Sequence, residues 1–156
     1  MYPDRFLNIL KFIFKWECVF KKGKHGNYDH VIWENEEGDP GGVTKWGIDQ
    51  RSHPDLDIKN LTQEQATEIY YNEYWLKYGC NVMLEKLGEV YFNCCVNCGA
   101  GRAKKILAKS EDAEKFMDNQ EAFYRGLVES KPAFSKFLKG WLNRTSDLRK
   151  FINTLK

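Results

Sequence analysis

Three side chains in the first third of the chain are candidates for acid–base chemistry: Glu17, Asp39 and Thr44. A glutamate buried on an apolar helix face has a raised pKa, because low-dielectric surroundings disfavour the charged carboxylate. Asp39 lies in a glycine-rich stretch with free backbone N–H groups nearby, a polar setting in which it would stay ionised. One protonated carboxyl and one ionised carboxylate are the pair that glycoside hydrolysis uses. In that chemistry Thr44 would hydrogen-bond a water held beside the substrate.

Each of these residues also has a purely structural interpretation. Glu17 would be a helix-end residue paired with a lysine or arginine. Asp39 would be a turn former, since Asp-Pro-Gly is common in turns. Thr44 would be an ordinary strand residue. The residue types alone leave both interpretations open.

The helix that must position Glu17 is the clearest element of the sequence. Phe6, Leu10, Ile13 and Glu17 follow one another at helical spacing, which places the carboxylate on the apolar stripe of its own helix. The lysines and glycine at 21–23 are typical of a helix C-terminus, so they are predicted to close this element.

The rest of the chain has mainly helical patterns. Residues 23–48 lose the helical period and predict one or two short strands with an irregular loop. Thr62, with Gln65 three residues later, predicts a capped helix start. Leu84 and Leu87 are predicted to face inward from the next helix, and Ser110 to cap a later one. Further helices are predicted over 83–98, 102–109, 110–128, 132–139 and 141–154. The expected fold is mainly α: one helical domain over 1–156, with a small β-hairpin or loop element between the first two helices.

Composition and charge limit the classes of function. The chain is 42% hydrophobic and 15% aromatic, enough for a compact core without disulfides. Residues 1–100 carry 11 basic and 15 acidic side chains, whereas residues 101–156 carry 13 basic and 7 acidic. The basic C-terminal third would suit an anionic polymer, or it would be a solvated helix surface. No helix-turn-helix, zinc-finger or basic-zipper pattern accompanies it, so nucleic acid is not an expected partner.

The five cysteines do not form a disulfide framework or a strong metal motif. Three of them fall within five residues and the number is odd, which favours a reducing compartment. Cys95 and Cys98 form one C-x-x-C, but no second one exists, and helical spacing explains Cys94 and Cys98 as buried residues. We therefore expect no metal site and no cofactor.

The N-terminal stretch is apolar but interrupted by charged residues, with no clean apolar core and no small-residue cleavage site. No apolar run approaches the roughly 18 residues of a membrane span. The expectation is a chain without a signal peptide or stable membrane insertion, cytoplasmic when made.

A family resemblance follows from several motifs taken together. Residues 15–17 read Lys-Trp-Glu, and residues 38–48 read Gly-Asp-Pro-Gly-Gly-Val-Thr-Lys-Trp-Gly-Ile. Other matching pieces are Leu61-Thr62, Ala66, Ile69-Tyr70, Tyr74-Trp75, 96–99, 101–103 and 140–144. With these residues the chain resembles the glycoside hydrolase family 108 muramidases, which are common among phage endolysins. The spacing of Asp39 and Thr44 is also similar to that in phage-type lysozymes.

The resemblance implies a lysozyme-like α+β fold and hydrolysis of the β-1,4 bond between N-acetylmuramic acid and N-acetylglucosamine in bacterial peptidoglycan. Glu17 matches the family's catalytic glutamate, with Asp39 as base or electrostatic stabiliser and Thr44 as water positioner. Three further residues are expected to line the sugar cleft or else to serve packing and helix capping: Trp46, Tyr74 and Asn97. The implied protein is a monomeric endolysin that accumulates in the host cytoplasm and acts on the wall after release.

The chain also departs from the family pattern. Cys18 and Val19 replace the two glycines that usually follow the glutamate, and residues 23–37 form an insertion. Asn93 stands where the family often has aspartate, and the usual C-terminal wall-recognition motif is absent. Two alternatives therefore stay open: a catalytically inactive module that binds wall or protein, and a lytic transglycosylase.

Overall fold

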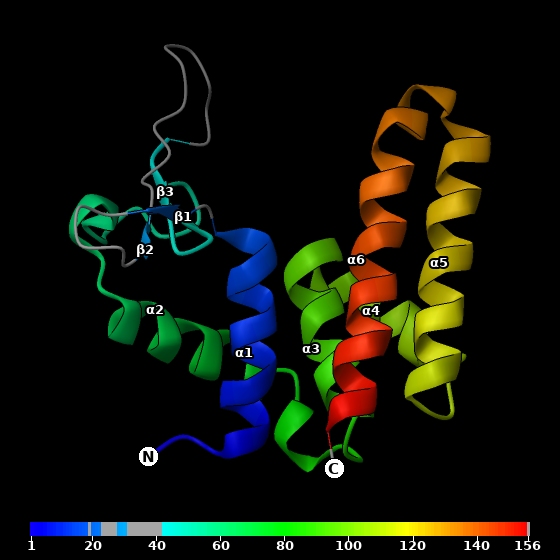
Figure 1. The fold of residues 1–156 in the computed structure, drawn as a ribbon, viewed down its shortest axis with the longest axis horizontal. Helices are drawn as coiled ribbons and strands as arrows, with labels where there is room; N and C mark the ends of the chain where they lie inside the picture. The colour runs from blue at the N-terminus through cyan, green and yellow to red at the C-terminus, as the bar shows by residue number, and fades with distance from the viewer. Residues whose placement is uncertain (19, 23–27, 31–41, 156) are drawn as a thin grey trace. The chain divides into compact units, whose positions relative to one another are not determined.

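A computed structural model describes most of the chain (Figure 1). The described residues are 1–18, 20–22, 28–30 and 42–155. Helices dominate, and short strands lie between the first two α-helices, so the predicted mainly α class with a small β element is confirmed. The chain divides into two compact units, Leu10–Asn72 and Met1–Ile9 with Glu73–Lys156. The single domain over 1–156 stays a prediction.

The Leu10–Asn72 unit contains the end of the first helix and two small hairpins. Helix α1 spans Asp4–Glu17. Strands β1 (Phe20–Lys22) and β2 (Tyr28–His30) pair antiparallel. Strands β3 (Thr44–Lys45) and β4 (Ile48–Asp49) form a second antiparallel pair.

The prediction that α1 closes at residues 21–23 was wrong, because the helix ends at Glu17 and Lys21 and Lys22 belong to β1. Their backbone is used in the ladder, where Lys21 faces Asp29. Lysines near a helix end are a weak signal, and the strand pairing overrides it.

Helix α2 begins where the sequence predicts. It spans Gln63–Tyr70 and follows a short 3₁₀ turn, η1 (Ile58–Asn60). The Gln65 N–H donates to Thr62 Oγ1 at 3.2 Å, and the Thr62 N–H donates to Gln65 Oε1 at 2.8 Å. This reciprocal capping box satisfies two backbone donors at the helix start. The helix continues as a π-helical segment, η2 (Tyr71–Leu76).

The other unit is a set of packed helices. Helix α3 (Leu87–Cys98) is buried along most of its length and contacts α4 (Ala100–Leu107) and α5 (Ala113–Ser130). Helix α5 and the last helix, α6 (Ser135–Thr154), run antiparallel side by side (Figure 1). Two 3₁₀ turns complete the unit, η3 (Cys80–Val82) before α3 and η4 (Pro132–Phe134) before α6.

Several predicted helix details in this unit were wrong. The helix predicted from 83 begins at Leu87, after Lys86 with a φ of 67°, so Leu84 is 73% exposed rather than inward. Ser110 does not cap α5, because its hydroxyl donates to the Ile106 carbonyl at 2.7 Å. Asp112 is the cap, accepting from the Lys115 N–H at 2.8 Å.

The two helices predicted at 132–139 and 141–154 were also wrong, because α6 runs without a break through Gly140. A glycine inside a helix costs only about 1 kcal/mol. Packing along the face of α6 that carries Thr145, Leu148 and Ile152 outweighs that cost.

Buried aromatics form the core of each unit. Phe6, Trp75 and Phe92 meet with ring centroids 5.4–5.8 Å apart. In the Leu10–Asn72 unit, Phe14 and Tyr70 meet edge to face at 5.8 Å. Among the described residues, no helix is both long enough and apolar enough to cross a membrane.

Candidate active site

The β3–β4 hairpin has a strained two-residue turn. The register pairs Thr44 with Asp49 and Lys45 with Ile48, so Trp46 and Gly47 alone connect the strands. Both have positive φ, 55° and 76°. Positive φ at both central residues is the feature of a type I′ turn, whose twist matches a β-hairpin. Glycine adopts this backbone readily, whereas a bulky tryptophan there costs about 1–2 kcal/mol.

Contacts with Leu61, Tyr70 and Phe14 help to hold Trp46 in this conformation. Its indole N–H donates to the Leu61 carbonyl at 3.1 Å, and its own carbonyl accepts from the Tyr70 hydroxyl at 3.2 Å. Its ring lies 5.5 Å from that of Phe14, centroid to centroid. Helices α1 and α2 therefore both anchor the turn, and these contacts offset the backbone strain.

The anchored turn packs directly against Glu17. A Cβ atom added to Gly47 would lie 3.0 Å from the Glu17 Cβ and 2.5 Å from the Tyr70 hydroxyl oxygen. Only glycine fits here, both for its φ and for this close approach. Glu17 is half-buried at the end of α1. The turn thus contacts the methylene part of the glutamate side chain from one side.

Cys18 stands beside Glu17 as a buried thiol. Its N–H donates to the Phe14 carbonyl at 2.9 Å. Burial, and then the negative charge of Glu17, raise the pKa of Cys18 to about 12. At neutral pH the residue is therefore an uncharged thiol, and this departure from glycine adds no charge next to the candidate acid.

The hairpin also carries an ionised carboxylate that the sequence did not single out. Asp49 lies across the ladder from Thr44 and accepts hydrogen bonds from the Ser52 N–H and hydroxyl, both at 2.8 Å. Partial burial acts to raise the pKa of Asp49, but the hydrogen bonds from Ser52, together with those from the backbone N–H groups of Arg51 and Asp49, outweigh it and lower that pKa. These bonds occupy Asp49 in closing the turn that follows β4.

The predicted site residues are distributed over both units. Glu17, Thr44 and Trp46 belong to Leu10–Asn72, where the β3–β4 turn meets Glu17. Asp39 lies outside the described residues. Tyr74 and Asn97 belong to the other unit. Tyr74 is half-buried and meets the Tyr78 ring edge to face at 6.1 Å.

Asn97 belongs to a hydrogen-bonded network within its unit. Its Nδ2 donates to the Tyr124 hydroxyl at 2.8 Å, and its Oδ1 accepts from Arg144 at 3.3 Å. It also lines a hollow of about 340 Å³. The same arginine donates twice to Asn93 Oδ1, at 2.8 and 3.2 Å, and Asn93 is only 1% exposed. Position 93, where the sequence departs from the family, is thus a buried acceptor for an arginine.

Sequence reasoning missed the residues that support the glutamate. Gly47 and Tyr70 are in the quoted motifs, but nothing in their spacing tells that the Tyr70 hydroxyl reaches the turn. The available signal was the Trp-Gly pair between two short β-like runs, because glycine in a two-residue connection favours a positive-φ turn.

Comparison with known proteins agrees with this arrangement. Residues 10–99 match the model of the family described as glycosyl hydrolase 108. The chain belongs to the glycosyl hydrolase 108 family. The matched span includes Glu17 and the whole β3–β4 hairpin. No curated protein matches the chain.

A solved structure extends the likeness over nearly the whole glycosyl hydrolase 108 chain. "Structure of Brucella abortus SagA" matches with a TM-score of 0.65 at 21% sequence identity. The match covers 94% of this chain and 92% of that one. At this identity the likeness shows the fold, and the predicted mainly α, lysozyme-like architecture is confirmed.

Gly47→Ala is expected to lower the free energy of unfolding by about 2 kcal/mol, since an L-residue at positive φ costs about 1–2 kcal/mol before any clash. Urea denaturation measures the change. Gly101→Ala is the matched control: Gly101 lies within α4, where an added Cβ meets nothing within 4 Å, so this change should be neutral or stabilising.

Combining Gly47→Ala with Tyr70→Phe separates the clash from the strain. Removing the hydroxyl frees the space 2.5 Å from the new Cβ. The loss in free energy of unfolding should therefore be smaller for the double variant than the sum of the losses for the two single variants. Strict additivity would contradict the close approach of the Tyr70 hydroxyl to Gly47.

Proposed function

We propose that the protein is a muramidase that hydrolyses the β-1,4 bond between N-acetylmuramic acid and N-acetylglucosamine in peptidoglycan, with Glu17 as general acid. The observation that carries the proposal is the packing of the Trp46-Gly47 turn against Glu17, inside the span that matches a glycosyl hydrolase family. The positive φ of Trp46 is energetically unfavourable, and two helices anchor the turn in that conformation beside the Glu17 side chain. Such strain is commonly found at functional sites.

The chemistry assigns one task to each residue. Glu17 gives its proton to the glycosidic oxygen as the bond from that oxygen to the sugar C1 breaks. A water adds its oxygen to C1, and Asp39 takes the proton that the water releases. Thr44 accepts or donates a hydrogen bond that holds this water. If Asp39 instead attacks C1 itself, its carboxyl must lie about 5–5.5 Å from that of Glu17, and wider separation favours inversion.

Substrate contacts are assigned with the same logic. The faces of Trp46 and Tyr74 would stack on sugar rings, and Asn97 would hydrogen-bond an acetamido group. The setting that fits this activity is a monomeric phage endolysin, made in the host cytoplasm and reaching the wall after release.

Digestion of purified peptidoglycan by the full chain tests the proposal. Turbidity should fall, and mass spectrometry of the fragments should find reducing N-acetylmuramic acid ends. Fragments with 1,6-anhydro ends would overturn hydrolysis as the proposed reaction and indicate lytic transglycosylation instead. Folded protein that clears no wall type would overturn the enzymatic proposal in favour of a binding module.

A further inference from the structure

Two hollows in the Glu73–Lys156 unit share lining residues, and lysine and arginine side chains line both of them. One has a volume of about 340 Å³, and Tyr124 and Trp141 are among the residues that line it. The other, of about 490 Å³, lies along α4 and α5. Arg102 and Phe123 line both hollows.

Four basic side chains line this pair of hollows, and the Cys98 thiol, whose pKa is lowered to about 6 chiefly by its hydrogen bond with Cys94, lines the first of them. Lys131 joins Arg102 at the first hollow, and Lys105 and Lys109 join it at the second. No aspartate or glutamate of the described ranges lines either hollow. The Arg102 guanidinium lies 4.1 Å from the centre of the Phe123 ring, and the Lys131 ammonium 5.7 Å from that of Phe134. Aromatic faces thus hold both cations at the rim without neutralising them.

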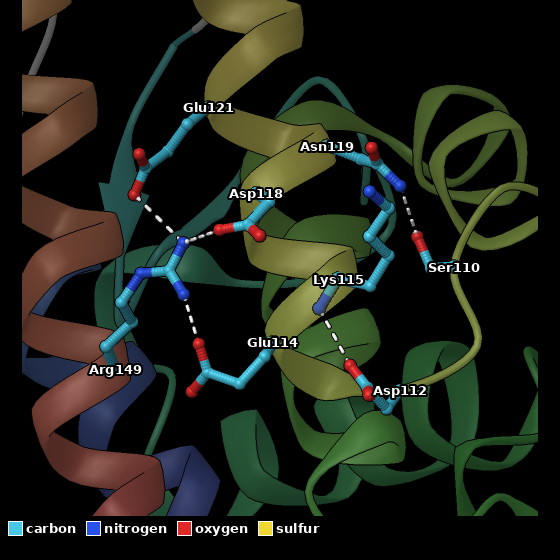
Figure 2. Close-up of polar contacts among 8 residues, drawn as sticks. All are labelled: Ser110, Asp112, Glu114, Lys115, Asp118, Asn119, Glu121 and Arg149. Carbon is cyan, nitrogen blue, oxygen red and sulfur yellow. Dashed lines mark hydrogen bonds and ion pairs between the residues drawn. The ribbon is translucent and has the colours of Figure 1, made fainter.

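Three of the four acidic residues of α5 form ion pairs on another face of that helix. Figure 2 shows Arg149 of α6 bonded to three of them: Glu114, Asp118 and Glu121. Asn119 points away from this cluster toward Ser110 and donates to its hydroxyl at 3.0 Å. The face of α5 that meets the hollows therefore presents Asn119 and Phe123 rather than a carboxylate. This arrangement keeps the basic rim available to an external anion.

From this complementarity we infer that the paired hollows bind the peptide stem of peptidoglycan through its carboxylates. The inference rests on the proposed function, which makes peptidoglycan the substrate. N-acetylated sugars are neutral, whereas the stem peptide carries free carboxylates and small apolar side chains. Arg102 lies within α4 and Lys109 two residues after its end, so the basic side chains extend along the helix and past it.

The shape favours a peptide over other anions. A phospholipid surface or a polyphosphate needs only exposed positive charge. Neither of them would fill two hollows that have aromatic and aliphatic walls. A short peptide would place carboxylates on the rim cations and methyl groups in the hollows. Arginine suits the carboxylate because its planar guanidinium accepts bidentate pairing.

Titration of the full chain with a synthetic stem peptide, L-Ala-γ-D-Glu-L-Lys-D-Ala-D-Ala, tests the inference by calorimetry. The peptide has no glycosidic bond, so binding is measured apart from hydrolysis. The double variant Arg102→Ala/Lys131→Ala is expected to bind about tenfold more weakly. Lys136→Ala is the matched control, since Lys136 is an exposed cation over the Phe137 ring that lines neither hollow.

Three outcomes would overturn the inference: no binding by wild type, equal binding of a peptide with amidated carboxylates, or equal weakening by Lys136→Ala. Phosphatidylglycerol vesicles and polyphosphate form two further arms. Binding of either with the same dependence on Arg102 and Lys131, and tighter than the peptide, would overturn it in favour of a lipid or polyphosphate partner.

Failure of this inference can be told apart from failure of the proposed function. If the protein clears the wall and leaves reducing ends but does not bind the peptide, only the inferred stem-peptide site is overturned. If the protein binds the peptide but does not clear the wall, the stem-peptide site is supported and the muramidase proposal is overturned.

Discussion

Glu17→Gln is expected to lower the rate of peptidoglycan clearing about 100- to 10,000-fold, the usual contribution of a general acid. Glutamine keeps the shape of the side chain but cannot give a proton to the leaving oxygen. The loss corresponds to about 3–5 kcal/mol of transition-state stabilisation. The measurement is the initial rate of turbidity loss, with reducing ends counted on the released fragments.

The Glu17→Gln experiment needs evidence that the variant is folded. Gly47 contacts the methylene carbons of Glu17, which glutamine retains, so the urea midpoint should stay close to that of wild type. Glu68→Gln on the exposed face of α2 is the matched control and should clear the wall at the wild-type rate. A Glu17→Gln variant that clears at an undiminished rate would exclude Glu17 as the acid, whatever the activity of the chain.

Parts of the fold around Glu17 were predictable because their signals are local in the sequence. Helical spacing placed Glu17 on the apolar stripe of α1, although the helix ends at that residue and not at 21–23 as predicted. The capping box at Thr62 depends on two side chains three residues apart, and both of its hydrogen bonds are present. Local backbone chemistry of this kind does not depend on the rest of the fold.

What the sequence could not predict depends on contacts between distant residues. The support of Glu17 comes from Gly47, which is thirty positions away, and from the Tyr70 hydroxyl on another helix. Ser110 and Asp112 are both good capping residues, and only the use of the Ser110 hydroxyl by Ile106 decides between them. Tertiary packing sets these outcomes, so no local pattern contains them.

Asn93 shows how a departure from a family pattern can have a structural meaning. Judged by sequence, the missing aspartate weakened the case for catalysis. In the fold Asn93 is buried, and its Oδ1 accepts two hydrogen bonds from Arg144. An amide oxygen makes the same acceptor contacts that a carboxylate oxygen makes. The substitution therefore leaves this part of the network intact and does not by itself count against an enzyme.

The ion pair between Arg5 and Glu89 is expected to be a large single contribution to stability. Glu89 lies on α3 and is 1% exposed. Arg5 approaches both of its carboxylate oxygens, at 2.8 and 3.0 Å, and the side chain of Arg5 is 28% exposed. The hydrogen bond that Arg5 donates to Glu89 is the main reason that the pKa of Arg5 is raised. The guanidinium also lies 5.7 Å from the centre of the buried Trp75 ring.

Arg5→Ala is therefore expected to lower the free energy of unfolding by about 3–5 kcal/mol, because it leaves a buried carboxylate without its partner. For a chain of this size the thermal midpoint should fall by roughly 10 °C. Calorimetry and urea denaturation both measure the loss. Arg125→Ala removes an exposed arginine from α5 and serves as the matched control, with an expected change within about 0.5 kcal/mol.

Replacing both partners distinguishes the cost of an orphaned charge from the worth of the ion pair. Arg5→Met/Glu89→Leu should recover most of the stability, since apolar residues of similar volume often replace a buried pair without loss. If the double variant is as unstable as Arg5→Ala, the pair itself supplies the stability through its geometry. If Arg5→Ala unfolds at the same urea concentration as wild type, the Glu89 carboxylate must reach water or another cation once Arg5 is gone. That result would contradict the prediction that an unpaired buried carboxylate destabilises the variant.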